Sequence, residues 1–421
     1  MIEKTKEKAH AALRWSERYT KTDMVYLAGG QFWAVIGQVV SSVTVFIFAI
    51  IVAQYLPKDV YGEYKYIIGV VALLSSFSLT GLSTAVFQSV ASGFDGSLHE
   101  GFWRNLKWSA LVFLGAFGLA AYYFSQGDHI LAGGVLIGGT LSPLLASANL
   151  IAPFLNAKKD FRRTAIYIGV IETLLSSGAL IITIFLTHNP LILASVYFLG
   201  NTFATLWIYR RIVKAYRPDP AKTDPGMMTY AKHLSAMGVL STIAANIDQV
   251  LLFHFVGPVQ LAIYNFATAI PDQTKGPLNM FNTMTQAKFI GRSDKEVRTG
   301  MRNKIFWLAI SSIAFVLLYI LIAPYFFAIF FPKYMEAVFY SQIYSISILT
   351  VVFAPAASYL IAKKKVREQY INNIALSVIQ ISSMLIGVIG WGLIGLVWAR
   401  VITRLAISSL TYVLYSRSLN G

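Results

Sequence analysis

Two stretches of the chain, YLPKDVYGEYKY at 55–66 and FVGPVQLAIYNF at 255–266, align position by position although two hundred residues separate them. Aromatic residues recur at the first, tenth and last positions of both, so that Tyr64 corresponds to Tyr264. Each stretch lies between two long apolar runs. The recurrence predicts two similar halves, an organisation that in membrane transporters places the substrate site between the halves. A chance match in a chain with 23 tyrosines and 28 phenylalanines is the alternative.

The composition is that of a membrane protein. The 421 residues are 56% apolar and only 13% charged, whereas soluble proteins carry about 25% charged residues. Apolar runs close to the ~20 residues that a helix needs to cross the hydrocarbon core recur along the whole length. These features predict an all-α polytopic membrane protein. Cysteine is absent, which excludes disulfides, a thiolate nucleophile and a thiolate metal site.

The apolar runs predict twelve transmembrane helices in two six-helix lobes around a central cavity. The expected spans are 27–54, 67–90, 106–125, 130–155, 165–187, 190–209, 233–256, 262–286, 305–331, 338–361, 371–390 and 393–415. The expected domains are a cytoplasmic N-terminal tail at 1–24, an N-lobe at 25–209, a cytoplasmic linker at 210–232, a C-lobe at 233–416 and a cytoplasmic C-terminus at 417–421. The glycines of GVIGWGLIG at 387–395 suit a tight turn between the last two spans.

Basic residues gather in alternate connections between the predicted spans. The opposite connections carry only Lys58, Lys65 and Lys333. Short loops rich in Lys and Arg stay in the cytoplasm, so both termini are expected inside. This topology, together with contact between basic loops and anionic lipid headgroups, accounts for the net charge of +16. Nucleic-acid binding is not needed to explain that charge.

Six charged residues fall well inside predicted spans, away from their ends. They are Glu172, Asp248, Asp272, Lys275, Arg400 and Arg404. A charge at the centre of a transmembrane helix costs roughly 2.5–3.5 kcal/mol on insertion scales. Such residues are tolerated where they face a cavity, water or each other, so the sequence predicts a polar interior.

The eighth predicted span is the most irregular, because Pro271 and Pro277 both interrupt it. The polar residues between and after these prolines include Asp272, Gln273, Thr274, Lys275 and Asn279. Each proline removes a backbone donor and disturbs the preceding turn. At 1.5 Å per residue, residue 272 lies about 15 Å from the outer end, near mid-membrane. A broken, charged helix at that depth predicts a cavity wall or hinge. A local ion pair between Asp272 and Lys275 is the alternative.

The remaining intramembrane charges each have two interpretations. Asp248 is a candidate proton or sodium site, or the partner of an arginine. Arg400 and Arg404 lie one helical turn apart, and their guanidinium groups suit phosphate oxygens. The alternative for both is pairing with the intramembrane carboxylates. Glu172 is either a coupling site of the first half or a hydrogen-bonded packing residue.

Other polar signals are weaker. Gln38, Ser41, Ser42 and Thr44 form a polar face that either lines the cavity or mediates close helix packing. The glycines of 390–395 match a dinucleotide-binding pattern formally, but no strand precedes them. The chain has no GxxxxGK[ST] motif and therefore no P-loop ATPase of its own.

With these features in place, the chain resembles the Wzx-type flippases of the multidrug/oligosaccharidyl-lipid/polysaccharide exporter superfamily. The resemblance rests on the span pattern, on NIDQVLLFHFVGPVQLAIYNFA at 246–267 and on the GWGLIG turn. Such proteins often carry an Asp in span seven, matched by Asp248, and a Gly-x-Tyr-like motif, matched by Tyr264. The motif's glycine is Ala262 here.

The resemblance implies a non-enzymatic flippase of the bacterial inner membrane. It would move an undecaprenyl-diphosphate-linked oligosaccharide outward through two lobes that form a V around a central, often cationic cavity. The implied substrate contacts are Lys275, Arg400, Arg404, Gln273 and Asn279, and the implied coupling or gating groups are Asp248, Asp272 and Glu172. The coupling ion would be H⁺ or Na⁺, without another cofactor or a resident metal. The implied partners are the lipid-linked oligosaccharide, membrane lipids, and a polysaccharide polymerase with its chain-length machinery.

Three other functions are weighed against this one. A multidrug exporter of the same superfamily would share the fold but favour an aromatic cavity in which acids dominate. A membrane glycan polymerase or ligase needs a large outer loop with catalytic Arg and His, and every predicted outer loop is short. A lipid II flippase usually has fourteen spans.

Overall fold

The computed structural model describes residues 24–273, 294–362 and 366–418, and all of its regular elements are helices. The first half contains α2 (Met24–Tyr55), α3 (Lys58–Ser75), α4 (Leu82–Ala91), α5 (Ser97–Trp108), α6 (Ala110–Ser125), α7 (His129–Ala148), α8 (Ile151–Ala157), α9 (Phe161–Arg163), η1 (Thr164–Glu172), α10 (Thr173–Leu186) and α11 (Pro190–Tyr216). The second half contains α12 (Met227–Phe255), α13 (Pro258–Gln273), α15 (Asp294–Phe330), η2 (Pro332–Tyr334), α16 (Ala337–Ser345), η3 (Ile346–Phe353), α17 (Ala354–Ala362) and α18 (Val366–Ser418).

The apolar helices are long enough to cross a bilayer. Nine helical stretches in the described part of the chain meet the length and hydropathy of a membrane span. Large apolar side chains cover their outer surfaces, with Leu186 79%, Phe203 72% and Leu321 69% exposed. A soluble protein would bury such surface, whereas lipid solvates it. The predicted all-α polytopic membrane fold is confirmed.

The longest stretch, α18, is a hairpin of two helices. Gly392 has φ 61° and ψ −137°, a conformation outside the helical region. Beyond the turn the two arms approach closely, because a Cβ on Gly395 would lie 2.0 Å from the Gly387 carbonyl oxygen. The predicted turn within 387–395 is therefore confirmed. The total of twelve spans stays a prediction, since α13 leads into residues outside the described part.

The second span differs from its prediction as one helix over 67–90. It begins at Lys58 and is interrupted between α3 and α4. Ser76 Oγ donates to the Leu73 carbonyl at 2.6 Å and Ser78 Oγ to the Ser75 carbonyl at 2.7 Å, local bonds that compete with the helix ladder. The interruption also frees the backbone N–H of Gly81, which donates to Ser235 Oγ of α12 at 3.0 Å. The break therefore joins this span to the second half.

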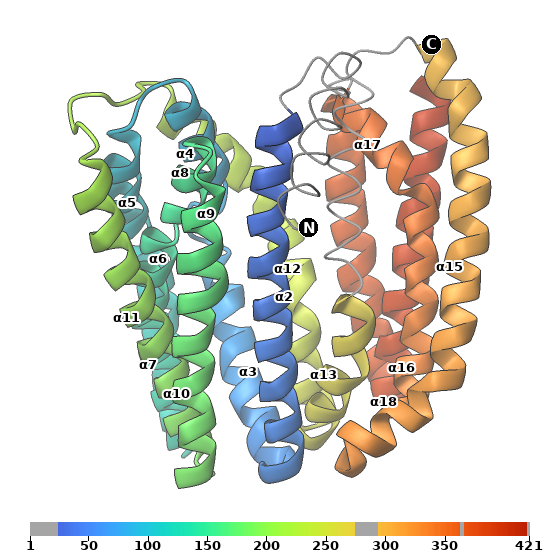
Figure 1. Cartoon of the computed structure of the whole chain (residues 1–421). Coiled ribbons are helices and arrows are strands. Elements are labelled where there is room, and N and C mark those ends of the chain that lie inside the picture. Colours follow the sequence, from blue (N-terminus) through green and yellow to red (C-terminus); the bar gives the residue numbers. More distant parts are fainter. Residues whose placement is uncertain (1–23, 274–293, 363–365, 419–421) are drawn as a thin grey trace, which may run out of the picture.

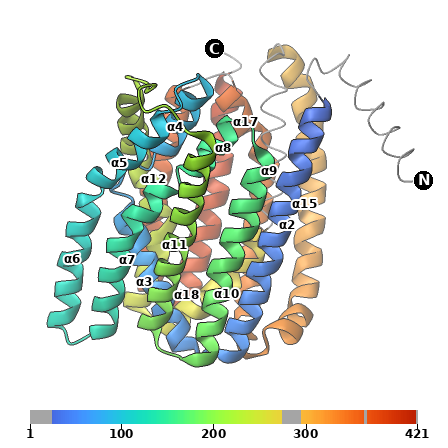
Figure 2. The same cartoon turned by 60° about the vertical axis from the view of Figure 1, so that its left-hand side comes forward.

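The helices connect at two opposite ends, visible in Figure 1. The turns between α2 and α3 and between α12 and α13 lie at one end, which we call the twin-turn end. The connection 217–226 and the end of α18 lie at the other, which we call the linker end. Figure 2 shows α2 alongside α10, and residues of these two helices contact each other.

The two recurring sequence stretches pack against each other at the twin-turn end. They form the start of α3 and the start of α13, two helices in extensive contact. The approach is close, because a Cβ on Gly62 would lie 2.0 Å from the Pro258 carbonyl oxygen. Around them the ring of Phe266 packs on Tyr61 at 5.4 Å and on Tyr334 at 4.0 Å between centroids. The two similar stretches thus form the two sides of one helix–helix contact.

The hydrophobic cores differ between the two ends of the molecule. At the twin-turn end one core joins both halves and includes Tyr64 and Phe198 of the first and Tyr264 and Phe327 of the second. At the linker end the described residues form two separate cores. One contains Leu82, Phe102, Phe154, Ile208 and Met227, and the other contains Met301, Tyr359 and Tyr415.

Polar contacts reinforce the junction at the twin-turn end. Lys58 forms an ion pair with Glu336, and Lys333 Nζ donates to the Gln54 carbonyl oxygen at 2.5 Å. Two of the three lysines predicted on this side therefore tie the first half to the second. The halves are closed on each other at the twin-turn end. The predicted domain boundaries stay predictions.

Candidate functional site

A buried ion pair lies in the second half. Asp248 of α12 pairs with Arg400 of α18, and their side chains are 5% and 12% exposed. The hydroxyl of Tyr264, from α13, donates to Asp248 Oδ2 at 2.5 Å and accepts from Arg400 Nη1 at 3.0 Å. Three helices are tied together by this contact. The pairing offsets part of the cost of burying these charges, while Asp248 Oδ1 and Arg400 Nε remain buried without a hydrogen-bond partner.

A second pair, more open, lies one helical turn along α18. Arg404 Nη1 is 3.4 Å from Asp272 Oδ1 of α13, and the side chains are 19% and 36% exposed. The Tyr344 hydroxyl donates to Asp272 Oδ1 at 2.9 Å, and its ring lies under the Arg404 guanidinium at 4.8 Å. Arg404 Nη1 also donates to Ser347 Oγ at 3.1 Å. Asp272 is thus the most accessible carboxylate of the two pairs.

Both arginines lie far from the turn that divides α18. Arg400 is eight residues from the turn at Gly392 and Arg404 is twelve, which places them about 12 and 18 Å from it at 1.5 Å per residue. A hydrocarbon core is about 30 Å thick, so both pairs lie near its middle. The charges were expected to face a cavity, water or each other, and the last of these is found for these four residues. Both arginines pair with intramembrane carboxylates, which was the alternative to binding phosphate.

Of the other residues predicted to matter in the eighth span, some lie in the described part of the chain and some do not. Pro271 is buried inside α13, and Gln273, the last described residue of that helix, has an exposed side chain. Lys275, Pro277 and Asn279 lie outside the described residues. The predicted pairing of Asp272 with Lys275 therefore stays untested, while the pairing of Asp272 with Arg404 is observed.

The sixth charged position, Glu172, belongs to a cavity in the first half. This cavity has a volume of about 590 Å³ and lies between α2, η1, α10 and α11. Thr205 Oγ1 donates to Glu172 Oε1 at 2.8 Å. The lining residues are Gly37, Gln38, Ser41, Val45, Asn149, Asn156, Phe161, Thr164, Ala165, Ile168, Gly169, Glu172, Thr173, Ser176, Ser177 and Asn201. None of them is basic and one is acidic.

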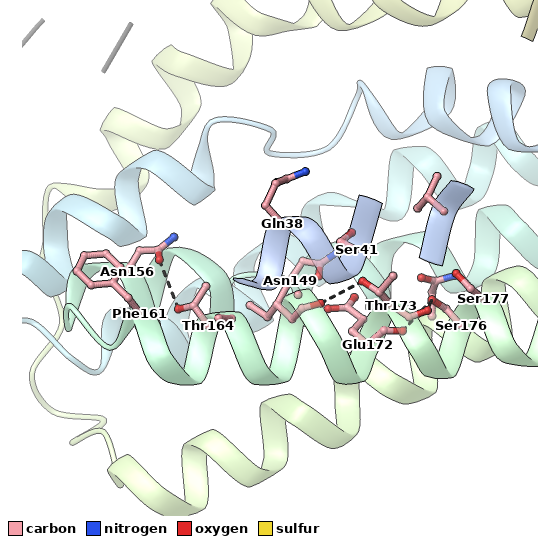
Figure 3. Close-up of a pocket in the computed structure, with 16 residues that line it drawn as sticks. Gln38, Ser41, Asn149, Asn156, Phe161, Thr164, Glu172, Thr173, Ser176 and Ser177 are labelled. Atoms are coloured by element: carbon pink, nitrogen blue, oxygen red, sulfur yellow. Dashed lines mark hydrogen bonds between the residues drawn. The ribbon is translucent and has the colours of Figure 1, made fainter. Parts of the chain in front are cut away.

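Small residues and a widened helix shape this cavity, which we call the first-half pocket. Residues 164–172 form a π-helix, a wider turn that often occurs at functional sites. A Cβ on Gly169 would lie 2.9 Å from the Gly37 Cα, so α2 and η1 touch through their backbones. Figure 3 shows Thr164, Glu172 and Ser177 in a row along one segment, with Gln38 beyond them on α2. Of the predicted polar face on α2, Gln38 and Ser41 line the pocket.

Sequence reasoning missed several members of these sites. Tyr344 and Ser347 carry no local signal, because only the fold brings them to Arg404. The first-half pocket had a usable signal in helical spacing. Glu172 and Ser176 are four residues apart, as are Asn201 and Thr205, and such residues share a helix face. Among the described residues, no group of His, Asp and Glu could hold a metal ion.

Comparisons with solved structures agree with this architecture. An inward-facing multidrug resistance MATE family transporter of the MOP superfamily superposes with a TM-score of 0.70 at 14% identity, covering 92% of this chain and 98% of that one. An outward-facing multidrug resistance MATE family transporter of the MOP superfamily gives a TM-score of 0.61 at 16% identity, covering 91% of this chain and 93% of that one. The lipid II flippase MurJ, in an inward closed conformation, gives 0.60 at 13% identity, covering 91% and 86%. At these identities the likeness establishes the fold.

Sequence comparison establishes the family. No curated protein sequence matches the chain. A family model described as polysaccharide biosynthesis protein matches residues 27–289, well over half of the chain. Together with the fold, this match confirms the resemblance drawn from the 246–267 segment. The chain belongs to the polysaccharide biosynthesis protein family and has the fold of the MOP superfamily transporters.

Proposed function

We propose that the protein is a flippase that carries a polyprenyl-diphosphate-linked oligosaccharide across the bacterial inner membrane by ion-coupled alternating access. The family supplies the link to polysaccharide biosynthesis, and the fold is shared with a transporter and with a lipid flippase. The observation that carries the mechanism is the partly exposed Asp272–Arg404 pair near mid-depth. An O-antigen, capsule or exopolysaccharide repeat unit would be the cargo, handed to a polymerase outside.

The orientation follows from the basic loops. The linker end carries the clustered arginines and lysines, so both termini and the 210–232 linker face the cytoplasm. The twin-turn end, where the halves share one core, then faces outward. The separate cores at the linker end support a state that receives its substrate from the cytoplasm.

Asp272 and Arg404 would act as an exchange pair. A guanidinium binds a phosphate group through the same forked geometry that it offers a carboxylate. In the absence of substrate Asp272 pairs with Arg404, which removes the cost of an unpaired mid-membrane charge. Protonation of Asp272 would release Arg404 to the diphosphate, and departure of the diphosphate would restore the pair. Substrate binding would thereby be linked to uptake of one proton.

The other pair would have a different role. Asp248 and Arg400 are almost fully buried and share the Tyr264 hydroxyl. A diphosphate cannot reach them without separating three packed helices, so we assign them to fixing α12, α13 and α18 to one another. Pro271, buried in α13, would be the point at which this helix bends around Asp272. Gln273, Lys275 and Asn279 would contact the substrate beyond it, with Pro277 as a second bend.

A multidrug exporter is the second candidate, and one observation favours it. The first-half pocket contains a carboxylate and no basic lining residue, a combination that also suits an organic cation. Its lining has one aromatic ring, Phe161, whereas sites for organic cations usually surround them with several. Efflux of a cationic dye from cells that express the protein would support this candidate.

The test of the proposed function uses surface glycan in cells that depend on this protein. Arg404→Ala and Asp272→Ala should each abolish glycan display while leaving the amount of membrane-inserted protein unchanged. Arg210→Ala removes the same side chain from an exposed position at the linker end and should leave display intact. Normal display in both pair variants would contradict the assignment.

A further inference from the structure

We infer that the first-half pocket is the binding site for an uncharged, hydroxyl-rich part of the transported glycan, and that it selects against anionic sugars. The inference rests on the proposed flippase function and concerns which glycan is accepted. The pocket holds about 590 Å³, within the range of roughly 300–1,000 Å³ that ligand sites occupy.

The kind of polar group in the lining decides the ligand class. Asn149, Asn201 and Gln38 carry amides, which both donate and accept hydrogen bonds, and Ser41 and Ser177 carry hydroxyls, which do the same. A sugar hydroxyl also donates and accepts, so each such residue can satisfy it in either direction. A metal ion needs acceptors alone, and an apolar ligand would leave these groups without partners.

The charge of the lining sets the selectivity. Glu172 is the single ionisable residue among the lining residues. The hydroxyl of Thr205 donates a hydrogen bond to one of its carboxylate oxygens. A sugar carboxylate entering the pocket would lie beside Glu172 without a basic side chain in the lining to neutralise it. Like charges placed together in a binding site are strongly unfavourable. A neutral sugar meets no such penalty and gains Glu172 as an acceptor.

The backbone geometry fixes the pocket in place. Gly37 and Gly169 hold α2 against η1, so the polar faces of both elements line one space. One helical turn from Gly37 on α2, the ring of Trp33 stacks with the Arg162 guanidinium at 5.3 Å, and this arginine is exposed. Arg162 is not among the lining residues, so its charge lies outside the pocket lining.

The test compares two lipids in proteoliposomes containing the full chain. One is a polyprenyl diphosphate carrying three uncharged hexoses, and the other carries a hexuronic acid in place of the terminal hexose. Translocation is followed by oxidation of the exposed sugar with impermeant periodate. We expect the neutral lipid to move at least about tenfold faster, the discrimination that an uncompensated like-charge contact provides.

Two substitutions in the lining should change that ratio. Ser177→Lys adds a cation to the pocket and should reverse the preference toward the acidic lipid, while Ser177→Gln, of similar length without charge, should not. Glu172→Gln keeps the shape of the side chain and removes its charge, so transport of the acidic lipid should rise. This variant keeps the inference testable if Ser177→Lys fails to fold. Equal transport of both lipids by the unaltered protein, or a ratio unchanged in Glu172→Gln, would overturn the inference while leaving the flippase function standing. Transport of neither lipid would contradict the proposed function itself.

Discussion

The interiors of the two halves carry different chemistry on one scaffold. In the second half, two carboxylates and two guanidinium groups neutralise each other near mid-depth. In the first half, a single carboxylate lies among uncharged amides and hydroxyls around an open pocket. The sequence positions two hundred residues before Asp248 and Asp272 are Phe48 and Ala72. Among the described residues these paired charges therefore lie in the second half. In the proposed function they would provide a site for the diphosphate, and the first-half pocket would provide one for sugars.

The corresponding tyrosines show how this difference is built. Tyr264 donates its hydroxyl to Asp248, whereas Tyr64 packs edge-on against the ring of Tyr197 at 6.1 Å. Both tyrosines are buried in the shared core. The same residue at the same place in the repeat thus serves an ion pair in one half and aromatic packing in the other.

The largest effect on this difference between the halves is expected when one member of the buried Asp248–Arg400 pair is removed. Asp248→Ala leaves the Arg400 guanidinium buried without its partner, which should cost about 3–5 kcal/mol of stability. The measurement is the thermal unfolding midpoint of the purified protein in detergent. The double variant Asp248→Leu with Arg400→Met removes both charges and should recover much of the loss. An unchanged midpoint in Asp248→Ala would show that the pair does not hold the second half together.

The next effect concerns the contact between the two recurring stretches. Gly62→Ala places a Cβ 2.0 Å from the Pro258 carbonyl oxygen, so α3 and α13 must separate. Overpacking of this kind costs roughly 1–3 kcal/mol, again measurable by thermal unfolding. Gly118→Ala is the matched control, since its added Cβ meets nothing within 4 Å. Equal stability of the two variants would mean that the close contact contributes nothing.

The smallest effect concerns the polar junction at the twin-turn end. Lys58 and Glu336 have side chains 29% and 48% exposed, and exposed pairs contribute at most about 1 kcal/mol. Lys58→Ala should therefore open this end modestly. A cysteine at Ala262, which is fully buried, should react up to about fivefold faster with a thiol reagent in that variant. Arg104→Ala breaks an exposed pair in α5 and should leave the rate unchanged. If the cysteine reacted at the same rate in both variants, the Lys58–Glu336 pair would not stabilise the junction.

Much of the fold could be predicted from the sequence, because lipid requires long apolar helices and glycine permits the turn at Gly392. The intramembrane charges were predicted to face a cavity, water or each other, since isolated charges at that depth are too costly. Pairing of the arginines with intramembrane carboxylates was one of two interpretations. Tyr344 and Ser347 were not predicted, because they reach Arg404 through tertiary packing alone. The break between α3 and α4 was missed although 76–81 reads SFSLTG, because hydroxyl residues are also tolerated inside spans; here local serine hydrogen bonds decide the break.

The most direct test of the central claim measures transport of a polyprenyl-diphosphate oligosaccharide by the Asp272→Asn variant in proteoliposomes, with and without a pH gradient. Asparagine imitates the protonated aspartic acid and leaves Arg404 permanently available to the diphosphate. The exchange model predicts that the unaltered protein transports the lipid and responds to the gradient. Asp272→Asn should bind the lipid at least as tightly but, having no carboxylate to displace the diphosphate from Arg404, should not transport it with or without the gradient. A variant that responds to the gradient as strongly as the unaltered protein would contradict the model.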